Sequence, residues 1–161
     1  MKKPTKILGI DPGYALAGWS VIEKDGQKLK MIEYGCFSSP KEMLHAERLG
    51  ELNKEIKRII KKHNPEVMAI EDLFFFKNLK TAIKVAEARG VILMTGINEG
   101  LKIEEFTPLQ IKQALVGYGR AEKKQIQQMV KMIMGLKEIP KPDDAADAVA
   151  VAITCANMAK H

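Results

Sequence analysis

Cysteine and histidine, the side chains that bind zinc most often, are scarce in this sequence. Its two cysteines lie far apart without the spacing of a metal site, so we expect free, mostly buried thiols at Cys36 and Cys155. The three histidines are expected on the surface: His45, His63 and His161. These absences exclude a disulfide scaffold and leave carboxylate oxygens as the natural ligands for any metal.

Long hydrophobic runs are missing as well. The first apolar run stops at Asp11, too early to form the core of a signal peptide. Nothing approaches the ~18 apolar residues that a membrane span requires. There is also no internal repeat, linker or low-complexity segment. We therefore expect one domain over residues 1–161, located in the cytoplasm.

Negative charge is in the minority, with 20 Asp and Glu against 26 Lys and Arg, for a formal net charge of +6. Hydrophobic residues make up 46% of the chain, a fraction typical of a globular domain. A positive excess of this size is compatible with binding to nucleic acid or another anionic surface, and it proves neither.

Three antiparallel strands are expected at the start of the chain. The apolar residues before Asp11 are typical of a strand that is covered on both faces. The Asp25-Gly26 pair suits a type I′ hairpin between the second and third strands. Strands joined by such tight turns must be neighbours in a sheet. The three expected strands span residues 7–11, 17–23 and 28–37.

Helices dominate the rest of the chain. Ser39 to Glu42 matches a capping box, which predicts a helix from there to Asn64-Pro65. A second capping box, Thr107 to Gln110, predicts another helix start. The expected later elements are a strand over 66–71, a helix over 79–98, a strand over 102–106, and helices over 107–115, 121–134 and 144–158, the last with Asp143 as its N-cap.

Two carboxylates are expected to meet at one edge of the sheet. Asp11 ends the first strand, although Asp-Pro-Gly is also an ordinary turn signal. Glu71 ends another short apolar run one helix later. A strand, helix and strand in succession usually form a right-handed crossover with parallel strands. Parallel neighbours lie ~4.8 Å apart, so Asp11 and Glu71 could share a cation; two unrelated surface acids are the alternative.

The last helix supplies two more acids. Asp144 and Asp147 lie three residues apart, so they share a helix face. A first-turn acid is favourable for the helix dipole and needs no further explanation, but Asp147 lies in the second turn among Ala and Val. Its burial would be costly without a partner, and a metal ion is the natural one. Oxygen ligands alone select a hard cation such as Mg²⁺ or Mn²⁺, and two such ions can cleave a phosphodiester.

Two further features have competing explanations. Phe74, Phe75 and Phe76 follow Glu71 in an expected loop, where they are either core residues or aromatic groups that stack on bases. Ala82, Ala86 and Gly90 are spaced by four on an expected helix. That small-residue face either packs on the protein's own sheet or forms the seam of a homodimer.

The order of elements and acids resembles the ribonuclease H-like α/β fold, with a five-stranded mixed sheet of three antiparallel strands and then two parallel strands, flanked by helices. Within that fold, the chain is similar to the bacterial RuvC family of Holliday-junction resolvases over nearly its whole length. The motifs that carry the resemblance are Gly9-Ile10-Asp11-Pro12-Gly13, Ala69-Ile70-Glu71, Ala88-Arg89-Gly90-Val91, Gln110-Ile111-Lys112-Gln113, Gly119-Arg120-Ala121-Glu122-Lys123 and Asp144-Ala145-Ala146-Asp147-Ala148.

The resemblance implies a Mg²⁺-dependent endodeoxyribonuclease of DNA recombination and repair, for which Mn²⁺ can substitute. Such an enzyme acts as a homodimer, binds a four-way DNA junction and nicks two opposing strands symmetrically, leaving 5′-phosphate and 3′-hydroxyl ends. RuvA and RuvB, the branch-migration proteins, are its expected partners. The family's catalytic, metal-binding acids correspond to Asp11, Glu71, Asp144 and Asp147. Its DNA-binding residues correspond to Phe74, Lys112 and Lys123.

Three other functions fit parts of the sequence. A related ribonuclease H-like nuclease that trims structured RNA shares the acid on the first strand, but it is not expected to have the two lysines and the phenylalanine. A noncatalytic nucleic-acid-binding module of the same fold would not need four intact acids. The actin-like ATPases open with a similar Asp-x-Gly turn, but 161 residues are too few for their two-domain architecture.

Overall fold

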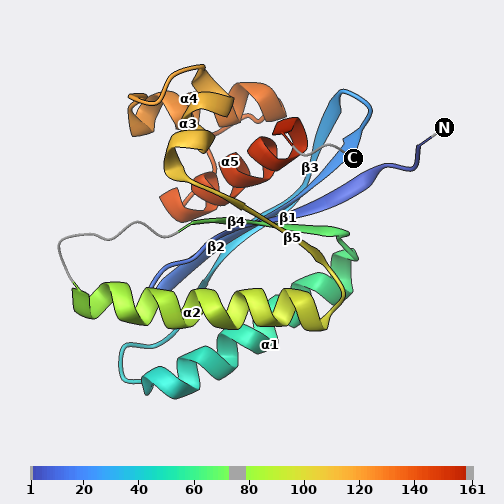
Figure 1. Ribbon diagram of the computed structural model, residues 1–161. Coiled ribbons are helices and arrows are strands. Elements are labelled where there is room, and N and C mark those ends of the chain that lie inside the picture. Colours follow the sequence, from blue (N-terminus) through green and yellow to red (C-terminus); the bar gives the residue numbers. More distant parts are fainter. Residues whose placement is uncertain (1, 73–78, 159–161) are drawn as a thin grey trace.

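Five strands and five helices make up the described part of the chain, residues 2–72 and 79–158 (Figure 1). This computed structural model confirms the expected order of elements. The elements are β1 (Thr5–Asp11), β2 (Leu16–Asp25), β3 (Lys28–Ser38), α1 (His45–His63), β4 (Val67–Glu71), α2 (Leu79–Asn98), β5 (Lys102–Phe106), α3 (Pro108–Val116), α4 (Lys123–Met134) and α5 (Asp143–Met158).

The sheet has the strand order β3-β2-β1-β4-β5. The β1–β2 and β2–β3 pairs are antiparallel, whereas β1–β4 and β4–β5 are parallel. The predicted mixed sheet is therefore confirmed, with β1 at its centre. A β-bulge shifts the β2–β3 register between Val21 and Ile22, leaving Ile32 without a partner in the ladder. That extra residue explains why apolar alternation in β3 is loose.

Helices cover both faces of the sheet. Helices α1 and α2 lie on one side, and α3, α4 and α5 lie on the other (Figure 1). In β1, Ile7 packs with the α5 side, whereas Leu8 and Ile10 pack with the α1 side. Because successive side chains of a strand point to opposite faces, Asp11 points to the α5 side, as Ile7 does.

Two strand glycines let α5 approach the sheet closely. A Cβ atom added to Gly9 would lie 2.2 Å from the carbonyl oxygen of Ala148, and one added to Gly18 would lie 1.9 Å from that of Asp144. Ser20 Oγ also donates a hydrogen bond of 3.0 Å to the Ala148 carbonyl oxygen. The first turns of α5 therefore rest directly on the backbone of β1 and β2.

The start of α1 and the hairpin turn differ from the sequence predictions. Helix α1 begins at His45, six residues after Ser39, with Leu44 at its N-cap position. In the segment that was predicted to start the helix, the carbonyl oxygens of Pro40 and Lys41 accept hydrogen bonds of 3.0 and 2.9 Å from Arg48. In the two-residue hairpin loop, Gly26 has a positive φ of 59° but Gln27 does not. A type I′ turn requires a positive φ at both positions, so that prediction is wrong.

Two histidines and one cysteine are placed differently from expectation. His45 is partly buried, and its Nε2 lies 3.4 Å from Glu87 Oε1. His63 is buried, not superficial, and its Nε2 lies 2.7 Å from Glu33 Oε2. His161 lies outside the described residues. Both thiols are free, but Cys36 is only partly buried whereas Cys155 is fully buried. Among residues 2–72 and 79–158, no helix combines the length and apolarity needed to cross a membrane.

Candidate active site

The two strand acids lie at the same edge of the sheet. Strands β1 and β4 pair in parallel with Ile10 opposite Ile70, so Asp11 and Glu71 follow on neighbouring strands. Val67 and Ala69 pack on the α5 side, which places Glu71 on that side as well. Asp11 and Glu71 therefore share one edge and one side of the sheet, as predicted, although Glu71 is not among the acids whose oxygens lie closest together.

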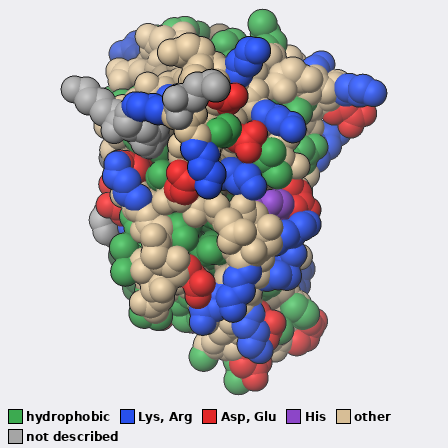
Figure 2. Space-filling view, turned by 90° about the vertical axis from the view of Figure 1, so that its right-hand side faces the viewer, with side chains coloured by type: hydrophobic (Ala, Val, Ile, Leu, Met, Phe, Trp, Pro, Cys, Tyr) green, Lys and Arg blue, Asp and Glu red, His purple; other side chains and the backbone are tan. Residues whose placement is uncertain are grey.

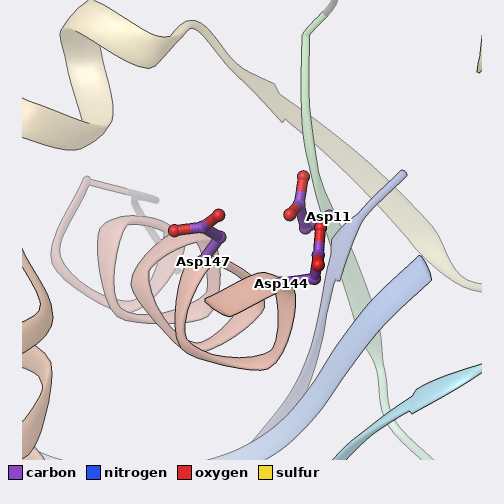
Figure 3. Close-up of side chains that lie close together, drawn as sticks. All are labelled: Asp11, Asp144 and Asp147. Atoms are coloured by element: carbon purple, nitrogen blue, oxygen red, sulfur yellow. The ribbon is translucent and has the colours of Figure 1, made fainter. Parts of the chain in front are cut away.

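Helix α5 adds two carboxylates to this edge. One oxygen each from Asp11, Asp144 and Asp147 lies within 4.8 Å of the others, and the three side chains converge in Figure 3. Asp144 and Asp147 come from the first two turns of α5, which the contacts at Gly9 and Gly18 hold against the sheet. We call these three aspartates together with Glu71 the acidic cluster.

Burial and mutual repulsion raise the pKa values of carboxyl groups in the acidic cluster. Burial, and then repulsion from Asp147, Glu71 and Asp144, raises the pKa of Asp11 to about 9. Burial also raises the pKa of Asp147 and of Glu71 above the usual range. Four carboxylates in one partly buried place favour the uptake of a proton or a cation. The all-oxygen donor set fits a hard divalent ion, so the residues present suit a Mg²⁺ or Mn²⁺ site.

Two lysines lie beside the acidic cluster. An open cavity of about 300 Å³ is lined by Lys112 from α3 and Lys123 from the start of α4, together with Glu71 and Asp147. Lys112 partly offsets the raised pKa of Glu71, and Lys123 does the same for Asp147. The cavity therefore has acidic and basic walls, an arrangement suited to a phosphate group that approaches bound cations.

Asp143 does not act as the predicted N-cap of α5. It is the first residue of the helix, and its carboxylate lies 3.1 Å from Lys123 Nζ and accepts a hydrogen bond of 3.1 Å from Gln127 Nε2. The hydrogen bond with Asp143 raises the pKa of Lys123. Asp143 thus holds the Lys123 ammonium group beside the acidic cluster through this ion pair.

Charges elsewhere on the surface follow a different pattern. In Figure 2, Lys and Arg side chains are interspersed with Asp and Glu over the face that is shown. Away from the acidic cluster, Lys62 Nζ lies 2.9 Å from Glu33, and Lys102 Nζ lies 2.6 Å from Glu104. Paired, exposed charges of this kind form an ordinary solvated surface.

Sequence reasoning missed the part that Gly18 plays in the site. A glycine inside a strand often marks a close backbone approach, and that was the available signal. The predicted junction-binding residue, Phe74, lies outside the described residues.

Comparisons with known proteins agree with this geometry. The family model described as crossover junction endodeoxyribonuclease RuvC matches residues 7–155. The crossover junction endodeoxyribonuclease RuvC of Halothermothrix orenii is 53% identical over 94% of this chain and 92% of its own length. The structure of Thermus thermophilus RuvC in complex with a Holliday junction substrate matches with a TM-score of 0.90 and 33% identity, covering 94% of this chain and 93% of that one.

A more distant structure shares the fold. The yeast mitochondrial Holliday junction resolvase Ydc2 matches with a TM-score of 0.70 at 12% identity, over 94% of this chain and 78% of that one. The similarity to the RuvC proteins is much stronger, since it extends to sequence over nearly the whole chain. This chain belongs to the RuvC family of crossover junction endodeoxyribonucleases.

Proposed function

We propose that this protein resolves Holliday junctions by nicking two opposing strands of a four-way DNA junction. The observation that carries the proposal is the convergence of Asp11, Asp144 and Asp147 within 4.8 Å in a chain of this family. Residues 1–161 act as one nuclease domain. In each nick, a water oxygen bonds to phosphorus while the bond from phosphorus to the 3′ oxygen breaks, leaving a 5′-phosphate and a 3′-hydroxyl.

The acidic cluster holds the metal in this proposal. Its ligands are Asp11, Glu71, Asp144 and Asp147, with Mg²⁺ as the ion, two ions per site, and Mn²⁺ as a substitute. Such ions activate water and stabilise the leaving oxygen. Without a cation, the same carboxylates repel a phosphate backbone, so metal binding and DNA binding support each other.

The surrounding side chains bind and orient the DNA. Lys112 and Lys123 line the cavity beside the acidic cluster, where their ammonium groups attract the phosphates on either side of the cut. Phe74, three residues after the end of β4 in the sequence, stacks on or between bases of the junction by resemblance to the family. This assignment rests on the sequence.

A homodimer is the assembly that fits the exposed face of α2. The inner face of this helix, Ala88, Ile92, Thr95 and Gly96, is buried. Its outer face carries apolar or small residues at helical spacing, from Leu79, which is 69% exposed, to Ile97, which is 61% exposed. We call this set the α2 stripe: Leu79, Ile83, Ala86, Gly90, Met94 and Ile97.

The exposure of the α2 stripe favours the homodimer explanation for Ala86 and Gly90, whereas Ala82 is partly buried and lies outside the stripe. Among residues 2–72 and 79–158, nothing beyond the helix's own backbone lies within 4 Å of a Cβ atom added to Gly90, so the described sheet does not cover this position. An exposed apolar stripe of this length is typical of an interface. A second copy that pairs along α2 would bring two acidic clusters to one junction. RuvA and RuvB remain predicted partners, and the cytoplasm remains the predicted location.

The proposal is tested with a synthetic four-way junction and Mg²⁺. We expect paired nicks in opposing strands that a ligase can seal. Asp147→Asn should abolish nicking and leave junction binding in place, since Asp147 belongs to the acidic cluster. A structured RNA of matched size distinguishes the RNA-processing alternative. If the protein cuts the RNA and not the junction, or if Asp147→Asn cuts the junction at the normal rate, the proposal is wrong.

A further inference from the structure

A partly buried arginine joins α2 to the end of β4. The side chain of Arg89 is 13% exposed. Its Nε donates a hydrogen bond of 3.3 Å to the main-chain carbonyl oxygen of Glu71. Its Nη2 makes an ion pair with Glu105 of β5 and lies 3.5 Å from Asp72 Oδ1. One guanidinium therefore contacts three groups at the same edge of the sheet.

These contacts lie on the opposite side of the sheet from the acidic cluster. Ile70 and Ile103 pack with the α1 and α2 side. Glu105 lies two residues after Ile103 in β5, so its side chain points to the same side. Asp72 directly follows the last residue of β4, and its Oδ1 lies 3.5 Å from Arg89 Nη2. Glu71 lies between Ile70 and Asp72, and its side chain points through to the α5 side. Arg89 thus contacts the backbone of Glu71 from the face of the sheet opposite to the Glu71 side chain.

Backbone pairing with β5 also supports the strand end, where Glu71 lies opposite Phe106. Beyond Glu71, the Asp72 N–H donates a hydrogen bond of 2.8 Å to the Phe106 carbonyl oxygen. The carboxylates of Asp72 and Glu105 are 48% and 49% exposed, and Arg89 provides a positive charge between them. Removing this charge would leave two acids close to an edge that already carries four carboxylates.

We propose that Arg89 is a positioning residue that fixes the carboxylate of Glu71 for divalent-ion binding, acting through the Glu71 main chain and from the opposite face of the sheet. It makes no contact with the acidic side chains themselves among the interactions of the described residues. The inference rests on the proposed function, because it assigns Arg89 to the metal site of that reaction. Outer contacts that orient a metal ligand typically change affinity or activity 10–100-fold when they are removed.

The test compares Mn²⁺ affinity with nicking in the full-length protein. Arg89→Met removes the hydrogen bond and both charge contacts, and we expect roughly tenfold weaker Mn²⁺ binding by calorimetry in the absence of DNA. Junction affinity in EDTA should stay within about twofold of the wild type. Nicking should slow at limiting Mg²⁺ and recover most of its rate at saturating Mg²⁺, without a change in the KM for the junction.

Two further variants separate positioning from support of the fold. Arg89→Lys keeps the charge but cannot serve the carbonyl and both carboxylates at once, so an intermediate Mn²⁺ affinity is expected. Arg58→Met is the matched control, because it removes an arginine from an exposed ion pair with Glu55 on α1. It should bind Mn²⁺ as the wild type does.

The outcomes distinguish the inference from the proposed function. If Arg89→Met lowers the Tm but its folded form binds Mn²⁺ as tightly as the wild type, Arg89 only supports the fold and the inference is overturned. It is overturned as well if Arg89→Met and Arg58→Met weaken Mn²⁺ binding equally. If the wild type binds Mn²⁺ but never nicks a junction, the proposed function fails, and the Mn²⁺ comparison still decides the role of Arg89.

Discussion

Replacing Asp11 by Asn should stabilise the metal-free protein while abolishing its proposed activity. Asp11 is held among three other carboxylates, which together with burial raise its pKa from 3.8 to about 9. A carboxyl whose pKa is raised by folding stabilises the fold only while it is protonated. Its contribution is complete below pH 3.8 and is lost as the pH rises toward about 9.

The magnitude follows from that pKa shift. Between 3.8 and pH 7 lie about three pH units, each worth ~1.4 kcal/mol, which sums to about 4 kcal/mol. Asn removes the charge but keeps only part of the hydrogen bonding of Asp11, so we expect a net gain on the order of 2–4 kcal/mol at pH 7. For a chain of this size, that corresponds to a rise in Tm of about 5–15 °C.

The assay is thermal unfolding in EDTA at several pH values. The Tm advantage of Asp11→Asn should be small near pH 4 and should grow through pH 7 toward pH 9. Adding Mn²⁺ should reverse the order, because a ligand of the folded state stabilises the wild type and binds the variant poorly.

Asp143→Asn serves as the control for this prediction. Its carboxylate pairs with Lys123, and the hydrogen bond to that lysine lowers the pKa of Asp143. Removing its charge should therefore bring no stabilisation in EDTA at any of these pH values. If Asp11→Asn is no more stable than the wild type in EDTA at pH 7 to 9, the repulsion inferred for the acidic cluster is absent and the reasoning is refuted.

Four other substitutions test the packing of α5, the α2 stripe and the role of Phe74. Gly18→Ala places a Cβ 1.9 Å from the Asp144 carbonyl oxygen, so α5 must shift; we expect a loss of about 1–3 kcal/mol in unfolding free energy and a loss of nicking. Gly50→Ala, at an open position of α1, should instead gain about 0.5–1 kcal/mol. Gly90→Arg on the α2 stripe should give a folded monomer by light scattering, and a dimer of unchanged mass would remove the stripe from the interface. Phe74→Ala should slow nicking while Mn²⁺ binding stays normal, since base stacking is worth about 1–3 kcal/mol; unchanged turnover would contradict its DNA-binding role.

Local patterns predicted the element order and the strand acids. Asp11 and Glu71 end apolar runs separated by one helix, and chain connectivity alone favours parallel strands with these acids at one edge. The capping box at Thr107 is also confirmed: Thr107 Oγ1 accepts from the Gln110 N–H at 3.2 Å, and Gln110 Oε1 accepts from the Thr107 N–H at 2.9 Å. Each of these features depends on residues close together in the sequence.

Local patterns gave wrong helix starts where a side chain from outside the motif binds the same segment. Ser39 to Glu42 has the composition of a helix start, but Arg48 donates hydrogen bonds to two main-chain carbonyl oxygens of that segment. Asp143 has the composition of an N-cap, but Lys123 and Gln127 engage its carboxylate. In both cases a long side chain from another turn or helix offers a partner that no local rule contains.

The sequence by itself determined which acids can share one side of the sheet, because strand alternation and helix spacing fix which face each acid occupies. Only the tertiary structure decided how closely these acids meet and what holds them there. Helix α5 packs directly on Gly9 and Gly18, and Arg89 donates a hydrogen bond to the main-chain carbonyl oxygen of Glu71. Both contacts join segments that are distant along the chain. Such contacts depend on the shape left when all the layers pack together, and that shape is a property of the whole fold.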